Sequence, residues 1–221
     1  MSFLKNDTIC AIATASGTAA VSMIRMSGKD SHKIALSRFI RKKELKINDI
    51  VANRMYYGEI ADLDGKIIDD VMVTFFKAPH SYTGEDSAEI VCHGSPFIQN
   101  KILEILIQSG ARLAEAGEYT MRAFVNNKMD LTQAEAVADL ISSQNEAEHR
   151  VAMNQLKGGF SKELQVLRSK LLDLTSLMEL ELDFSEEDVE FADRTKLNNL
   201  VDETSAKIQK LTDSFRLGNT I

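Results

Sequence analysis

Cysteine is scarce in this sequence, and no long run of apolar residues occurs. Two cysteines, Cys10 and Cys92, among 221 residues are too few for a disulfide framework and lack the paired spacing of a zinc site. No apolar stretch approaches the ~20 residues that a membrane helix requires. The amino-terminal sequence MSFLKNDTIC has no basic region followed by an apolar core, so it predicts no secretory signal. We therefore expect a protein without a membrane segment, located in the cytoplasm.

The common catalytic motifs are also missing. The chain has no G-x-x-x-x-G-K-[ST] loop, no G-x-G-x-x-G turn and no G-x-S-x-G elbow. Its four histidines include no pair at i and i+4. His93 follows Cys92, but neighbouring residues of a strand point to opposite faces, so the two side chains do not form a dyad. The residues by themselves predict no catalytic group and no metal ligand.

Negative charge is unevenly distributed along the chain. The net charge is −7, of which residues 1–120 contribute −1 (14 basic against 15 acidic residues) and residues 121–221 contribute −6 (12 against 18). The one basic cluster, RFIRKKELK at residues 38–46, is favoured to be a solvated helix end and loop. An auxiliary contact with RNA stays open as the alternative, because nucleic-acid binders usually present a basic face.

Residues 1–120 predict a mixed α+β domain. Short apolar, β-branched runs favour strands, and apolar residues at helical spacing favour helices. Asp64-Gly65 lies between two alternating runs and predicts a β-hairpin. The expected strands are residues 8–14, 21–26, 53–61, 66–77 and 88–92, and the expected helices are residues 30–39 and 97–108.

From residue 121 to residue 221 the sequence predicts the first part of an all-α bundle. Thr132 and Glu135 are spaced as a capping box, which predicts a long helix ending at Gly158-Gly159. Heptad-spaced apolar residues predict a second helix with a bundle core: Leu164, Leu167, Leu171, Leu174 and Met178. The acidic stretch 185–193 is favoured as a solvated loop over a metal site, and a last helix is expected from Thr195. Because the sequence stops directly after that helix, we expect more to follow in the natural protein.

Three isolated charges are the binding candidates. Glu89 lies in the apolar run AEIVC of a predicted loop–strand–loop segment, Lys77–Pro96, where a carboxylate is costly unless it is paired. Arg25 has similar apolar neighbours, and Lys128 follows FVNN. Each alone is typical of a structural ion pair. Together they suit a ligand with an anionic tail and a ring bearing N–H donors, since a carboxylate accepts two parallel N–H bonds. Tyr82 can stack on such a ring.

Four segments resemble the MnmE/TrmE family of tRNA-modification GTPases. They are DTICAIAT…VSMIRMSG (7–28), HSYTGEDSAEIVCHG (80–94), GEYTMRAFVNNKMDLTQAEAVADLI (117–141) and LELDFSEED (180–188). The resemblance implies an amino-terminal domain that binds a 5-formyltetrahydrofolate-type folate, forms a homodimer and is similar to the folate domain of aminomethyltransferases. It also implies a helical domain into which a G domain is inserted. With the FAD-dependent partner MnmG, the whole protein would install carboxymethylaminomethyl or aminomethyl groups at the wobble uridine of tRNA, using GTP, Mg²⁺ and K⁺.

The segments IRMSG, GEDSAEI and FVNNK match the motifs of the family that contact folate. The resemblance therefore implies folate contacts at Arg25, Glu89 and Lys128. We expect the folate ring near Glu89 and its glutamate tail near Arg25 or Lys128. Residues 15–20, ASGTAA, depart from the PPGRGG common in the family, which alters the edge of that pocket. The G domain is absent from this sequence, so we expect the chain alone not to hydrolyse GTP. Two alternatives stay open: a stand-alone folate-dependent aminomethyltransferase-like enzyme, and a module that only dimerises.

Overall fold

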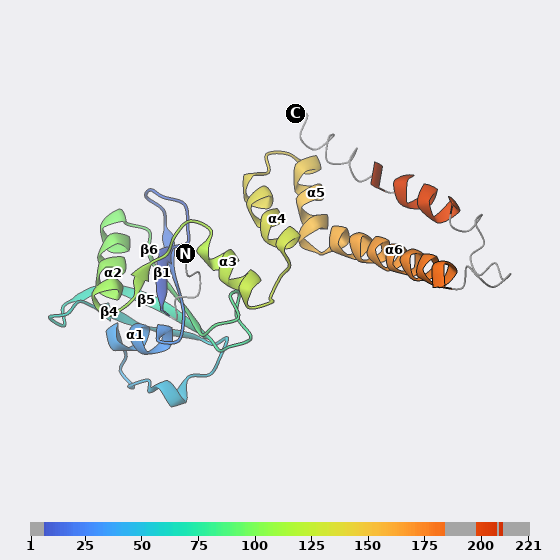
Figure 1. The fold of residues 1–221 in the computed structure, drawn as a ribbon. Helices are drawn as coiled ribbons and strands as arrows, with labels where there is room; N and C mark the ends of the chain where they lie inside the picture. Colours follow the sequence, from blue (N-terminus) through green and yellow to red (C-terminus); the bar gives the residue numbers. More distant parts are fainter. Residues whose placement is uncertain (1–6, 184–197, 207, 210–221) are drawn as a thin grey trace. The chain divides into compact units, whose positions relative to one another are not determined.

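The computed structural model describes residues 7–183, 198–206 and 208–209 of the chain (Figure 1). The chain divides into two compact units, Met1–Met129 and Asp130–Ile221. This division falls later than the predicted one between residues 120 and 121. The reason is helix α3 (Glu118–Val125), whose Arg122 forms ion pairs with Asp7 and Glu85 of the first unit.

The first unit combines one sheet with helices, which confirms the α+β prediction. Its sheet has the strand order β3-β4-β5-β6-β2-β1-β7, and every pairing is antiparallel except that of β1 with β7. The elements are β1 (Ile9–Ile12), β2 (Val21–Ser27), α1 (Ser31–Arg38), β3 (Phe39–Ile40), η1 (Ile47–Asp49), β4 (Met55–Ala61), β5 (Ile67–Phe76), β6 (Ser87–His93), α2 (Pro96–Gln108), β7 (Arg112–Leu113) and α3.

The predicted hairpin joins β4 and β5. Asp62 N donates to Lys66 O at 3.0 Å, and Gly65 N donates to Asp62 O at 3.2 Å. Gly65 has φ +80°, a left-handed conformation that glycine adopts without the steric cost of a Cβ. The Asp-Gly signal therefore located this turn correctly.

Helices α1 and α2 pack on one face of the sheet and enclose the core. Ile24, Phe75 and Ile90 supply the strand side, and Ile102 of α2 packs against them; all four are fully buried. Burying an aliphatic or aromatic side chain of this size contributes about 1.5–3 kcal/mol. Helix α2 has Pro96 in its first turn, where the missing N–H costs nothing, and it ends before Ser109-Gly110 as predicted. This packing makes the sheet a rigid platform.

The other face of the sheet is partly open. In one row of paired residues, Thr74 lies beside Glu89, Glu89 beside Arg25, and Arg25 beside Ala11. The next row is apolar and pairs Tyr57 with Met72, Met72 with Val91, and Val91 with Met23. Tyr57 is 66% exposed and Met72 is 39% exposed. We call these two rows the open face.

Gly94 holds the loop before β2 against the end of β6. Ala19 N donates to Gly94 O at 3.0 Å, and Gly94 N donates to Ala20 O at 3.3 Å. A Cβ at Gly94 would clash with Ala19 O and lie 2.6 Å from Ala19 C, both backbone atoms. This close approach places the unusual ASGTAA loop at the end of the sheet.

We expect Gly94→Ala to lower the free energy of unfolding by about 1–3 kcal/mol, because the backbone must move to admit the methyl group. Chemical denaturation of the two proteins measures the difference. Ser16→Ala, an exposed position of the same loop, is the control and should change stability by less than ~0.5 kcal/mol. Equal stability of Gly94→Ala and the wild type would show that the contact is not tight.

The second unit is helical, but its first helix differs from the predicted one. Helices α4 (Leu131–Ser142) and α5 (Glu146–Leu156) replace a single long helix. The capping box uses Asp130 and Gln133 rather than Thr132 and Glu135: Gln133 N donates to Asp130 Oδ1, and Asp130 N donates to Gln133 Oε1, both at 2.9 Å. The break follows from Asn145, which accepts from Glu148 N and starts α5. Both expectations were therefore wrong in detail.

Helix α6 (Gly159–Asp183) confirms the predicted helix, and its heptad positions are buried to different extents. Only Leu167 is buried, whereas Leu164, Leu171 and Met178 are 42–47% exposed. Residues 198–206 are also helical, and Leu200 and Val201 line a groove together with Leu171. The acidic stretch 185–193 lies outside the described residues. Among the helices that are described, none is long and apolar enough to cross a membrane.

Candidate functional site

Arg25 and Glu89 form an ion pair on the open face. They are direct cross-strand neighbours of β2 and β6, so their side chains emerge side by side. Arg25 Nε donates to Glu89 Oε1 at 2.9 Å, and Nη2 lies 2.8 Å from the same oxygen. The side chains are 27% and 22% exposed. The Glu89 carboxylate thus has the counter-charge that its apolar context requires, and Arg25 donates its hydrogen bond to Oε1.

Two tyrosines flank this pair. The guanidinium carbon of Arg25 lies 5.5 Å from the ring centre of Tyr82 and 5.8 Å from that of Tyr119, a cation–π distance for both. Tyr119 Oη donates to Arg25 O at 2.6 Å, and Tyr82 Oη lies 2.9 Å from Thr120 Oγ1. Burial raises the pKa of Tyr119 far above its usual value, so its hydroxyl stays protonated. The tyrosines fix the direction of Arg25 and surround it with aromatic surface.

Lys128 lies against the loop that carries Tyr82. Its Nζ donates to Pro79 O at 2.9 Å, and its side chain would be 3.2 Å from a Cβ at Gly84. No carboxylate within the described parts of the chain pairs with Lys128. The structure therefore joins Arg25 and Glu89 directly, and Lys128, which follows α3, contacts the loop that bears Tyr82. Ligand binding by these three residues stays a prediction.

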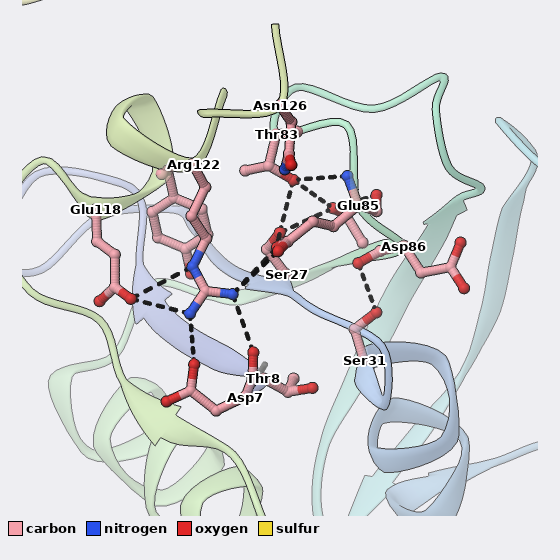
Figure 2. A network of polar contacts seen from close by, with 12 residues as sticks. Asp7, Thr8, Ser27, Ser31, Thr83, Glu85, Asp86, Glu118, Arg122 and Asn126 are labelled. Atoms are coloured by element: carbon pink, nitrogen blue, oxygen red, sulfur yellow. Dashed lines mark hydrogen bonds and ion pairs between the residues drawn. The ribbon is translucent and has the colours of Figure 1, made fainter. Parts of the chain in front are cut away.

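A second cluster of charges centres on Arg122 of α3 (Figure 2). Its guanidinium pairs with Asp7 at 2.7 Å, Glu118 at 2.9 Å and Glu85 at 3.1 Å. The Arg122 side chain is 8% exposed and that of Glu118 is 6% exposed. Arg112 contacts Asp7 and Glu118 from the outside. This network fixes the start of β1, the Glu85 loop and α3 to one another.

Glu85 links the network to the loop of the candidate site. Ser27 Oγ donates to Glu85 Oε2 at 2.7 Å, and Asn126 Nδ2 donates to Thr83 O at 2.7 Å. The loop that presents Tyr82 is thus anchored on both sides. Sequence reasoning missed this network, although Glu118 and Arg122 have the i, i+4 spacing of a helical ion pair. Their partners Asp7 and Glu85 lie too far along the chain to be paired by spacing.

The network makes stability depend on acid pH. Hydrogen bonds from Arg112, Glu115 N and Arg122 lower the pKa of Glu118 to about 2, although burial opposes this shift. Arg112 and Arg122 also hold the pKa of Asp7 below its usual value. A carboxyl group with a depressed folded-state pKa stabilises the fold above its unfolded-state pKa, and the contribution disappears as pH falls through the folded-state pKa.

We therefore expect the free energy of unfolding to decrease steadily from about pH 4.5 to about pH 2. Urea denaturation at several pH values measures this slope. Glu118→Gln removes the titrating group, so its stability should depend less on pH in the same range. An identical slope for both proteins would contradict the assignment to Glu118.

His93 and the two cysteines are not among the partners of Arg25, Glu89 and Lys128. Cys92 is buried and His93 is exposed, on opposite faces of β6. Burial raises the pKa of both Cys10 and Cys92 to about 11, so neither thiol is a ready nucleophile. Across the residues with described positions, no three His, Cys, Asp or Glu side chains are arranged to hold a metal ion.

We expect the pKa of His93 to lie above its usual value of about 6.5. Asp69 Oδ1 lies 2.7 Å from His93 Nδ1, and this hydrogen bond and charge favour the imidazolium. The stabilisation is fully present below the unfolded-state pKa and is lost as pH rises through the folded-state pKa. An NMR titration of the imidazole protons measures the value. Asp69→Asn should return it towards 6.5, and no change on that substitution would disprove the pairing.

Comparisons with known proteins agree with the two units. The family described as "GTP-binding protein TrmE N-terminus" matches residues 8–128, and "MnmE helical domain" matches residues 131–221. Curated relatives named "tRNA modification GTPase MnmE" are 54% identical in Bacteroides thetaiotaomicron, 52% in Porphyromonas gingivalis and 50% in Flavobacterium johnsoniae. These matches cover 97–99% of this chain but only 45–47% of each relative. The chain thus spans about half the length of these relatives.

The fold and the matches together define an α+β amino-terminal unit joined to a helical unit. The chain belongs to the TrmE/MnmE family. The limits of the two family matches coincide closely with the limits of the two units, on either side of residue 129.

Proposed function

We propose that this chain is the folate-binding and helical part of a tRNA-modification GTPase. The observation that carries the proposal is the Arg25–Glu89 pair, which lies beside two tyrosines on the open face. The ligand would be 5-formyltetrahydrofolate or a related tetrahydrofolate. Arg25 donates to Glu89 Oε1, so Oε2 can accept N–H bonds from the edge of the pterin ring. The reaction class, modification of tRNA, is inferred from the name of the relatives.

Lys128 has the chemistry to bind the glutamate tail of the folate. It is exposed, has no carboxylate partner in the described regions and contacts the loop that carries Tyr82 through Pro79 O. Arg25 is already paired with Glu89, so a second anion would compete with that carboxylate. We therefore assign the tail to Lys128 and the ring to Glu89, with Tyr82 available for stacking.

The open face also supports homodimerisation of the first unit. Its apolar row includes the exposed Tyr57 and Met72, and Met55 of the same strand is 56% exposed. Exposed apolar surface of this kind often marks a contact with another protein. A second copy of the chain is the partner that the family suggests. The division into an amino-terminal and a helical domain follows the two compact units.

In the whole protein, GTP, Mg²⁺ and K⁺ would bind to a G domain outside these residues, and MnmG would be the partner in tRNA modification. The product would be a carboxymethylaminomethyl or aminomethyl group at the wobble uridine, made in the cytoplasm. In this proposal the present residues supply the folate site and the dimer contact but not the GTPase site.

Nucleoside mass spectrometry of tRNA tests this function. A strain lacking the gene should lose the modified wobble uridine, and a plasmid carrying the full-length gene should restore it. Unchanged wobble uridine in the deletion strain would overturn the proposal. Turnover of a one-carbon folate by the chain alone would instead favour a stand-alone aminomethyltransferase. A stable dimer that binds no folate would favour a module that only dimerises.

A further inference from the structure

Positive charge gathers in one segment of this acidic chain. Residues 33–54, which we call the basic segment, contain seven basic and two acidic residues and so carry a net charge of +5. The net charge of the chain is −7, so the other residues together carry −12. The seven cations are Lys33, Arg38, Arg41, Lys42, Lys43, Lys46 and Arg54. Such a concentration in an acidic protein indicates a polyanionic partner.

These cations lack the carboxylate partners that other arginines have. Arg38 donates to Ser109 Oγ and to Asp62 O, and Arg41 donates to Tyr57 O. Within the described ranges, no residue of the basic segment forms an ion pair, in contrast to Arg25 and Arg122. Lys42, Lys43 and Lys46 are exposed. Their charge is therefore available to a ligand.

Tyr56 shapes the loop that presents these charges. The guanidinium carbon of Arg41 lies 5.3 Å from the centre of the Tyr56 ring, and that of Arg54 lies 5.6 Å from it. Val51 N donates to Tyr56 Oη at 2.8 Å, and the ring itself packs on Phe75 of the core. Figure 1 shows this loop, in light blue around η1, running along the outside of the first unit beyond α1. Arg41 and Arg54, near the two ends of the loop, thus both contact the buried ring of Tyr56.

A hollow of about 400 Å³ lies at the start of the loop. It is lined by Leu36, Ser37, Phe39, Ile40, Arg41, Glu44 and Leu45. The apolar members can contact a flat base, and Glu44 can accept N–H bonds from its edge. Pockets that take unpaired bases in RNA-binding proteins combine apolar or aromatic contacts with hydrogen bonds to the base edge. This mixed lining fits a nucleobase better than a lipid acyl chain.

We propose that the basic segment binds an unpaired stretch of RNA. The RNA phosphates contact Arg41, Lys42 and Lys43, and one splayed base enters the hollow. This inference rests on the proposed function, because it makes the segment a contact surface for the tRNA that the whole protein modifies. The segment runs from α1 through β3 and η1 to the start of β4, and the assigned folate residues lie on other elements. Substitutions in it therefore leave the folate site intact.

Binding of a fluorescent tRNA transcript to the full chain, measured by anisotropy over a range of salt concentrations, tests the proposal. We expect Lys42→Glu/Lys43→Glu to weaken binding at least tenfold and to reduce the slope of log K against log salt by about 1.4, or ~0.7 per lost phosphate contact. Lys157→Glu/Lys162→Glu makes the same change in net charge at exposed positions of the helical unit. This control should bind within twofold of the wild type. An unpaired oligoribonucleotide should compete better than a perfect RNA duplex.

The outcomes separate this inference from the proposed function. Equal affinity and slope for the wild type and Lys42→Glu/Lys43→Glu overturn the inference, while restored wobble-uridine modification leaves the function standing. Unchanged wobble uridine in the deletion strain together with no tRNA binding by the wild type rejects both. The same variant is also tested on vesicles containing phosphatidylserine. Loss of vesicle binding with unchanged tRNA binding assigns the segment to a lipid surface and overturns the RNA assignment.

Discussion

Arg122→Met is expected to lower the free energy of unfolding of the first unit by about 3–5 kcal/mol. The side chain is 8% exposed and pairs with Asp7, Glu118 and Glu85. Methionine retains much of the volume but no donor, so the nearly buried Glu118 carboxylate loses one of its partners. Removal of one partner from a buried ion pair is costly because the remaining charge stays in a poorly solvated place. Urea denaturation followed by circular dichroism measures the loss.

Arg112→Met is the matched control for this prediction. Arg112 contacts two of the same carboxylates, Asp7 and Glu118, but its side chain is 32% exposed, so water can replace it. Partly exposed charges are screened by water, so we expect a smaller loss than for Arg122→Met, even though Arg112 also contacts the buried Glu118. Equal losses for the two variants would show that burial does not decide the strength of this network.

Glu89→Gln is expected to weaken binding of 5-formyltetrahydrofolate at least tenfold, which corresponds to about 1.4 kcal/mol. The amide has nearly the shape of the carboxylate, and its oxygen can still accept from Arg25. Its hydrogen bond from the folate ring is weaker, because the amide oxygen lacks the negative charge that strengthens a bond to a carboxylate. Calorimetric titration of the two proteins measures the ratio of affinities.

Two further variants are titrated in the same way. Lys128→Gln should weaken binding of 5-formyltetrahydrofolate more than that of a folate analogue without the glutamate tail, because only the former has the anion that Lys128 would hold. Glu104→Gln alters an exposed carboxylate of α2, whose partner is Lys101 on the same helix, and should leave affinity unchanged. Equal affinity of Glu89→Gln and the wild type would remove Glu89 from the site.

Much of the first unit followed from local sequence patterns. The alternation of β5 and the Asp64-Gly65 turn identified a hairpin because both signals act between near neighbours. The two-residue strands β3 and β7 were not predicted, since Phe39–Ile40 and Arg112–Leu113 are too short for a periodic pattern. They form because the rest of the sheet offers them free edges.

The helical unit shows where periodicity misleads. The heptad of α6 correctly predicted a helix, since apolar spacing reports the period of the backbone. It did not predict burial, because burial depends on what packs against that face, and Leu164 and Leu171 remain exposed. The capping box uses Asp130 and Gln133, and the Thr132 hydroxyl itself donates to Asp130 Oδ1, a choice between neighbouring candidates that motif spacing cannot resolve.

The candidate site was predicted as three isolated charges, and the structure adds their partners. Glu89 in an apolar strand required a counter-charge, and Arg25 provides it across the sheet. Pattern alone could not pair them, because the register of two strands distant in sequence depends on the folded sheet. For the same reason the contacts of Tyr119 and Arg122, which position the site from α3, were not foreseen.

Calorimetric titration of the wild-type chain with 5-formyltetrahydrofolate is the decisive test of a folate site at Arg25 and Glu89. We expect saturable binding with a negative heat-capacity change, because the folate ring buries apolar surface beside Tyr82 and Tyr119. The same titration followed by NMR should shift the ring resonances of both tyrosines, which lie within 6 Å of Arg25. Absence of saturable binding up to millimolar ligand, with the protein folded, would show that this chain has no folate site.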